Sequence, residues 1–185
     1  MKRALFISGS MGSGKTTIAS YVAQRAYAMM YEPIQMKFAD PLYDMHKAIM
    51  DILKSYGHVP PTTIDRTLLQ LLGTDWARNN HDTDFWVNIL KPRIDLSLMD
   101  KRNIVIVDDV RFENELKLAD SFESCRVRLN ASEDSRKNRA KKWGNTSHSS
   151  ETALDGSTSF DLVFDTTNAH LEDISGDIWQ WMVKN

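Results

Sequence analysis

The sequence is poor in cysteine and has neither a long apolar run nor a marked excess of charge of one sign. Cys125 is the only cysteine, so no internal disulfide can form, and the reducing cytoplasm is the expected compartment. No apolar stretch approaches the roughly 20 residues of a membrane-spanning helix, so we expect no membrane partner. A formal net charge of −2 argues against a surface that binds the backbone of a nucleic-acid polymer.

The spacing of the histidines also excludes a zinc-stabilised segment. The sequence contains 5 histidines, but none shows a zinc-ligand spacing, and no second cysteine is present. What remains is an ordinary composition, with 42% hydrophobic and 26% charged residues in 185. These values indicate one globular domain, residues 1–185, that is large enough to bury a sizeable core.

Short apolar runs alternate with stretches of helical periodicity along the chain. The runs predict strands at residues 4–8, 34–38, 104–107, 126–129 and 162–164. The periodic stretches predict helices at residues 15–31, 40–53, 64–72, 84–98, 114–119, 132–142 and 171–181. We expect Asp40 to cap its helix, Gly73 to interrupt the third helical stretch and Pro92 to kink the next. The alternation predicts an α/β fold with a parallel sheet covered on both faces.

A glycine-rich segment at residues 9–16 matches the P-loop motif G-x-x-x-x-G-K-[ST] between a predicted strand and a predicted helix. Its backbone amides and the helix N-terminus would cradle phosphate oxygens, Lys15 would reach the β- and γ-phosphates, and Thr16 would bind Mg²⁺. GTP is disfavoured because no Asn-Lys-x-Asp signature is present. The motif therefore predicts a P-loop NTPase three-layer fold that binds ATP and Mg²⁺ through Ser10, Gly12, Ser13, Gly14, Lys15, Thr16 and Thr17.

Charged residues follow the most apolar predicted strand, at residues 104–107. Asp108 is the candidate metal ligand, Asp109 a candidate catalytic group and Arg111 a candidate phosphate ligand, because ligands bind at the carboxyl ends of such strands. Which carboxylate serves the metal is open. The alternative is a charged turn in which Asp109 and Arg111 simply pair.

A basic helix is predicted at residues 132–142. Arg136 and Arg139 share a face of it and are candidate catalytic groups that would stabilise the charge of a transferring phosphoryl group. We interpret residues 131–152 as a basic lid and residues 40–99 as a helical substrate-binding insertion. The core would then comprise about 1–39, 100–130 and 160–185. The alternative for the basic helix is a solvated surface.

Together these motifs resemble the deoxynucleoside monophosphate kinases of bacteriophage type. The resemblance rests on five stretches in order, at residues 9–17 (GSMGSGKTT), 38–42 (FADPL), 68–75 (LLQLLGTD), 108–115 (DDVRFENE) and 147–151 (SHSSE). The fourth stretch is the most specific. The resemblance implies ATP-dependent phosphorylation of a deoxynucleoside 5′-monophosphate for DNA precursor supply, in a host cytoplasm if the protein is phage-encoded.

The resemblance also assigns candidates for the acceptor. Arg66 and Arg78 would hold the monophosphate together with Arg111, and Trp86 would stack on the base. Each has a structural alternative, as an exposed helix charge or a core side chain. The remaining candidates are Asp40, Ser149 and Glu151.

Other functions remain compatible with the sequence. A P-loop kinase of another small metabolite would share the P-loop and the lid, and a nucleotide-dependent switch ATPase would hydrolyse ATP without an acceptor. A kinase of nucleic-acid ends is disfavoured by the net charge. A homodimer through the closing helix, with Trp179, Trp181 and Met182, is the alternative to ordinary core packing of these side chains.

Overall fold

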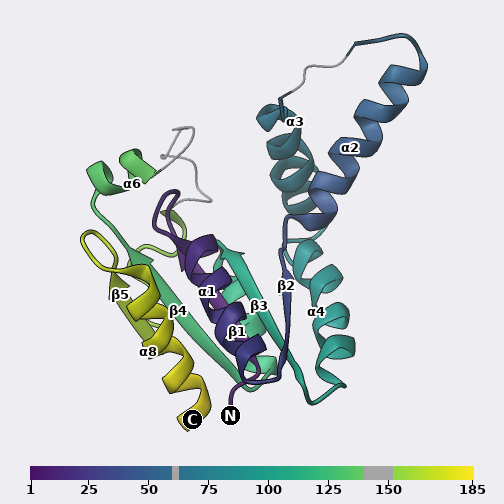
Figure 1. The fold of residues 1–185 in the computed structure, drawn as a ribbon. Helices are drawn as coiled ribbons and strands as arrows, with labels where there is room; N and C mark the ends of the chain where they lie inside the picture. Colours follow the sequence, from purple (N-terminus) through teal and green to yellow (C-terminus); the bar gives the residue numbers. More distant parts are fainter. Residues whose placement is uncertain (60–62, 140–151) are drawn as a thin grey trace.

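A parallel sheet forms the centre of the computed structural model, which describes residues 1–59, 63–139 and 152–185 (Figure 1). Neighbouring strands are parallel throughout, in the order β2-β3-β1-β4-β5. The strands are β1 (Ala4–Gly9), β2 (Glu32–Met36), β3 (Asn103–Val110), β4 (Ser124–Asn130) and β5 (Leu162–Asp165).

Helices connect the strands and cover both faces of the sheet, as the alternation predicts. The α-helices are α1 (Lys15–Ala28), α2 (Asp40–Ser55), α3 (Arg66–Gln70), α4 (Phe85–Leu98), α5 (Glu113–Leu118), α6 (Glu133–Arg139) and α8 (Leu171–Lys184). A π-helix, η1 (Leu71–Asn79), continues α3, and a 3₁₀ turn, η2 (Ala119–Ser121), follows α5. None of the helices in the described part of the chain combines the length and apolar character needed to cross a membrane.

The side-chain alternation of β1 divides the core into two layers. Leu5 and Ile7 belong to the layer under α1 and α8, whereas Phe6 belongs to the layer under α4 and α5. All three are fully buried, and each contributes on the order of 1.5–3 kcal/mol of hydrophobic free energy. Two apolar layers around one sheet make the predicted three-layer arrangement.

The core layer under α1 and α8 also contains Cys125 and side chains of the closing helix. Cys125 is buried there, and burial raises the pKa of its thiol. Met182 is fully buried, while Trp179 and Trp181 pack against the same layer. Core packing therefore accounts for Met182 and for the buried parts of Trp179 and Trp181, while a dimer contact through this helix stays a prediction.

The expected interruption at Gly73 is wrong, because the helical backbone continues through it from α3 into η1. A Cβ atom at Gly73 would lie only 2.9 Å from Leu42 Cδ2, so the glycine permits close packing against α2. The Gly73 carbonyl accepts a hydrogen bond of 2.9 Å from Trp86 Nε1. Glycine here serves a tertiary contact and does not end the helix.

Two further boundaries differ from expectation. Asp40 is the first residue of α2 and not its cap, because its carboxylate turns back to accept from the Lys37 amide at 2.9 Å. The helix predicted at residues 15–31 ends at Ala28, since Met30 adopts a left-handed φ of 64°. Pro92 lies inside α4, which continues to Leu98.

An arm of helices extends beyond the carboxyl ends of the strands. We define this arm as α2, α3 and η1; Figure 1 shows it on one side of the P-loop, with α6 on the other. The P-loop connects β1 to α1 between them. The fold thus places the phosphate-binding motif between two helical elements.

We predict that Trp86→Phe destabilises the protein by about 1–3 kcal/mol, because it removes the donor to the buried Gly73 carbonyl and keeps most of the ring volume. Urea unfolding measures the change. Trp179→Phe is the matched control, since no described residue accepts a hydrogen bond from that indole, and it should cost less. Equal losses in the two variants would contradict the importance of the Trp86 bond.

Candidate functional site

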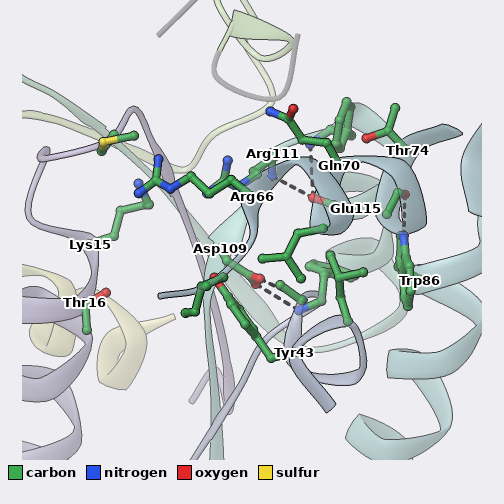
Figure 2. Close-up of a pocket in the computed structure, with 18 of the residues that line it drawn as sticks. Lys15, Thr16, Tyr43, Arg66, Gln70, Thr74, Trp86, Asp109, Arg111 and Glu115 are labelled. Carbon is green, nitrogen blue, oxygen red and sulfur yellow. Dashed lines mark hydrogen bonds between the residues drawn. The ribbon is translucent and has the colours of Figure 1, made fainter. Parts of the chain in front are cut away.

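A pocket of about 1350 Å³ opens at the carboxyl ends of the strands, between the P-loop and the arm (Figure 2). Side chains from the P-loop, β3, α6 and the arm line it. Sites for single small ligands span about 300–1,000 Å³, so this pocket has room for two substrates together. Among the P-loop predictions, it is lined by Gly12, Gly14, Lys15, Thr16 and Thr17.

Two glycines of the P-loop adopt conformations that other residues rarely take. Gly12 has φ of 78°, and a Cβ atom there would lie 2.5 Å from the Arg136 carbonyl oxygen. Gly14 has φ of 94° and is the N-cap of α1, with no side-chain hydrogen bond at the cap. The loop therefore leads into α1 with backbone groups rather than side chains at the helix start, as an anion cradle requires.

Lys15 lies at the mouth of this cradle. Its Nζ donates to the carbonyls of Gly9 (2.5 Å) and Ser10 (3.0 Å). Phosphate oxygens are stronger acceptors than neutral carbonyls, so a bound phosphate would attract this amine. Ser10 and Ser13 do not line the pocket with their side chains, and the Ser13 hydroxyl is fully buried without a described partner.

Thr16 and Asp108 meet at the end of β3. The Thr16 hydroxyl donates to Asp108 Oδ2 at 2.8 Å, and Lys37 Nζ lies 3.1 Å from Asp108 Oδ1. Burial lowers the pKa of Lys37, but Asp108 and the neighbouring carboxylates outweigh this effect and raise it overall. A hydroxyl and one carboxylate are hard oxygen donors that fit Mg²⁺, which takes few protein ligands and completes its shell with water and phosphate. No group of three or more metal-ligating side chains is found among the described residues.

Asp109 faces the other way, toward the start of the arm. Its carboxylate accepts from the amides of Phe38 and Ala39, each at 3.0 Å. Burial raises the pKa of Asp109 to about 6, although the two amides lower it. These two bonds give Asp109 a positioning role at the start of α2, and because Asp109 also lines the pocket, the catalytic role expected from the sequence stays a prediction. Asp40 likewise holds backbone and does not line the pocket.

Arg78 and Glu115 form a buried ion pair between the arm and α5. The Arg78 side chain is 9% exposed and lies over the Phe112 ring, 4.2 Å from its centroid. Glu115 also accepts from the amides of Arg111 (2.7 Å) and Phe112 (3.2 Å). Arg78 is therefore not an exposed helix charge; it fixes the turn that carries Arg111.

Arg66 and Arg111 are exposed and line the pocket. In Figure 2 both lie between Lys15 on one side and Gln70 on the other. Arg139 also lines the pocket, and its guanidinium donates to the carbonyls of Thr166 (2.5 Å) and Thr167 (3.1 Å). The predicted lid arginine Arg136 is half-buried and lies outside the pocket lining, with its backbone against Gly12.

Trp86 corrects another expectation. Its side chain is only 3% exposed, belongs to the core layer under α4 and α5, and is bound to Gly73. A ring that stacks on a base needs an open face, so Trp86 forms the pocket's wall and not a base platform. Ser149 and Glu151 lie outside the described residues.

Several lining residues escaped the reasoning from sequence. They are Tyr43, Gln70, Thr74, Phe112 and Glu115, and Lys37 beside Asp108 was missed as well. Arg66, Gln70, Thr74 and Arg78 follow one another at intervals of four residues. This spacing was a readable signal for one shared helix face. Nothing local marks Lys37, whose partner Asp108 is distant in sequence, whereas the N3 position of Glu115 in α5 was a local capping signal.

The fold is similar to that of several solved P-loop kinases. The APS kinase of Mycobacterium tuberculosis, solved with AMPPNP and APS, matches with a TM-score of 0.56 at 11% identity, over 100% of this chain and 98% of that chain. Shikimate kinase from Acinetobacter baumannii, in complex with shikimate, gives 0.54 at 11% identity, covering 100% and 95%. A gluconokinase from Sinorhizobium meliloti gives 0.50 at 17% identity, covering 98% and 91%. These likenesses establish the fold.

The family follows from sequence. A profile of the family described as deoxynucleotide monophosphate kinase matches residues 42–176. The chain belongs to this family and is a phosphotransferase that acts on a nucleotide or another small metabolite. No curated protein sequence matches the chain significantly.

Glu115 should make stability depend on pH. Burial raises its pKa to about 7 from a value of 4.5, although Arg78 and the neighbouring amides lower it. Between these two values the folded protein binds more protons than the unfolded chain. The contribution of Glu115 to stability is therefore fully present below pH 4.5 and is lost as the pH rises through 7.

We predict that Glu115→Gln flattens this part of the stability profile, because the amide cannot ionise. Urea unfolding between pH 4.5 and 8 measures the slope for both proteins. Glu113→Gln, on the exposed side of α5, is the control and should keep the wild-type slope. Parallel profiles for wild type and Glu115→Gln would show that Glu115 does not titrate in this range.

Proposed function

We propose that the protein transfers the γ-phosphoryl group of ATP to the 5′-phosphate of a deoxynucleoside monophosphate, giving the diphosphate, and so supplies DNA precursors. One observation carries the proposal: the P-loop shares its pocket with a separate set of arginines on the arm and after β3. A phosphate-binding loop facing a second group of cations suits two phosphorylated substrates held end to end. Membership of the deoxynucleotide monophosphate kinase family supports the same acceptor class.

At the donor end, the P-loop amides and Lys15 would hold the β- and γ-phosphates. Thr16 and Asp108 would hold Mg²⁺, and Lys37 balances the charge of Asp108. When bound, Mg²⁺ supplies neutralisation of the phosphate charge. In this proposal the protein contributes position and electrostatic stabilisation rather than covalent chemistry.

Among the lining residues that the structure describes, every carboxylate already accepts hydrogen bonds. Among the described lining residues the carboxylates are Asp109 and Glu115, and no histidine is present. Both carboxylates already accept backbone amide bonds, and Glu115 also pairs with Arg78. A hydroxyl acceptor would need a base for its proton, whereas a monophosphate oxygen is already an anionic nucleophile. The site therefore favours a phosphate acceptor over a hydroxyl-bearing metabolite.

Arg139 and Arg136 would stabilise the charge that spreads over the transferring group. Arg139 lines the pocket, and the backbone of α6 packs against the P-loop at Gly12. A small movement of α6 would therefore change the distance between Arg139 and a γ-phosphate bound in the P-loop. Such a movement would also restrict water, which competes with the acceptor for the phosphoryl group.

We expect ADP release from ATP-Mg²⁺ to be stimulated strongly by at least one of the four deoxynucleoside monophosphates. A coupled ADP assay with each acceptor measures this, and separation of the products identifies the diphosphate. Lys15→Ala should abolish transfer. Slow ATP loss that is indifferent to all four acceptors would instead favour a switch ATPase, and stimulation by a non-nucleotide alone would favour a metabolite kinase.

We predict that Arg111→Ala raises the KM for the acceptor by about tenfold or more, because one charge-assisted contact to the monophosphate is lost. The KM for ATP should change by less than about threefold. Initial-rate kinetics with each substrate varied in turn separate the two effects. Arg93→Ala, an exposed position on α4 outside the pocket, is the control. Equal loss for both substrates would assign Arg111 a structural role.

A further inference from the structure

A polar stripe runs along one continuous helical segment of the arm. We define the polar stripe as Arg66, Gln70, Thr74 and Arg78, which lie four residues apart and all line the pocket. Arg66 and Gln70 belong to α3, and Thr74 and Arg78 to η1. The inner end of the stripe, Arg78, is fixed by its ion pair with Glu115.

The π-helix explains how a spacing of four keeps these side chains in one pocket. An α-helix has 3.6 residues per turn, so a stripe with this spacing would drift by about 40° at each step and by about 120° over three steps. A π-helix has i→i+5 hydrogen bonds and a wider turn, so its residues drift in the opposite sense. The change from α3 to η1 at Leu71 therefore compensates the drift and returns Thr74 and Arg78 to the pocket.

The middle of the stripe lies on a rigid part of the arm. Gly73 is buried, packs against Leu42 and accepts the Trp86 hydrogen bond. Thr74 follows Gly73 directly. Residues that recognise a ligand work best on backbone that packing holds in place.

The stripe also has a direction within the pocket. Figure 2 shows Lys15 and Thr16 on one side, Gln70 and Thr74 on the other, and Arg66 with Arg111 between them. An acceptor whose phosphate lies at the arginines, next to the donor phosphate, extends away from the P-loop. Its far end then lies beside Gln70 and Thr74.

The far end of the pocket has the chemistry of a nucleobase site. Leu42 lies against Gly73, next to Thr74, and supplies apolar surface there, while Tyr43 is another aromatic side chain in the lining of the same pocket. Gln70 supplies an amide with donors and an acceptor, and Thr74 a hydroxyl that does both. No described residue forms a hydrogen bond with either side-chain group, so the structure leaves both able to pair with a ligand.

We infer that Gln70 and Thr74 read the hydrogen-bonding edge of the acceptor's base, and that the α3–η1 transition exists to align them. The inference rests on the proposed function, because it assumes an acceptor with a phosphate and a base. Gln70 and Thr74 determine which bases are accepted, while Arg66 and Arg111 bind the phosphate common to all of them. Phosphate affinity and base choice are thus separated along one helical segment.

The test uses Gln70→Met and Thr74→Val, which keep side-chain size and remove hydrogen-bonding capacity. For each variant, kcat/KM is measured with the four deoxynucleoside monophosphates and with the base-free acceptor 2-deoxyribose 5-phosphate. We expect kcat/KM for the preferred base to fall by about tenfold or more and the differences among bases to shrink. Transfer to the base-free acceptor and the KM for ATP should keep their wild-type values. The controls are Gln180→Met on α8 and Thr67→Val on α3, both exposed outside the pocket.

Calorimetric binding of the four monophosphates without ATP separates this inference from the proposed function. Base-selective binding that is lost in Gln70→Met supports the inference even if no phosphoryl transfer is found, in which case only the proposed function fails. If Gln70→Met and Thr74→Val weaken binding equally for all four monophosphates and for the base-free acceptor, the inference is overturned. Phosphoryl transfer by the wild-type protein would in that case still support the proposed function. Wild-type protein that binds none of the monophosphates would overturn both.

Discussion

Two adjacent carboxylates at the end of β3 organise the site, and they do so because strand residues alternate in direction. Asp108 turns to the P-loop, where it binds Thr16 and pairs with Lys37. Asp109 turns to the arm, where it holds the amides of Phe38 and Ala39. One strand end thus holds the Thr16 hydroxyl of the P-loop and the entry to α2. In the function that we propose, the donor and acceptor halves of the site would share this support.

The second support is the buried pair of Arg78 and Glu115. Burying two charges is unfavourable, and such pairs add little net stability unless further hydrogen bonds satisfy them. Here Glu115 accepts two backbone amides as well as the guanidinium, and Arg78 covers the Phe112 ring. The pair joins η1 to the turn that carries Arg111. Its value lies in the position of Arg111 relative to the arm more than in stability.

Reasoning from sequence succeeded where signals are local and failed where partners are distant. The alternation of strands and helices and the P-loop context are local patterns, and the fold followed from them. The candidate site residues divided: Arg66, Arg78, Arg111 and Arg139 line the pocket, whereas Asp40 and Arg136 do not. The break at Gly73 and the base platform at Trp86 were wrong because Gly73 packs against Leu42 and the Trp86 indole donates to the Gly73 carbonyl, which are contacts between separate helices. The cap at Asp40 was wrong for a local reason, since its carboxylate accepts from the Lys37 amide three residues earlier. Propensities assigned from neighbouring residues cannot predict contacts between separate helices.

Net charge shows the same limit. A value of −2 says little about the site that we propose, in which two phosphorylated substrates would lie near each other. Beside this pocket Lys37 pairs with Asp108, and within it Arg78 pairs with Glu115, while Arg66 and Arg111 lie at the proposed boundary between the donor and acceptor halves. Repulsion between two phosphates close together is largest at that boundary, and cations there oppose it most effectively. The distribution of charge within the pocket, and not its sum over the chain, therefore determines which ligands the protein can bring together.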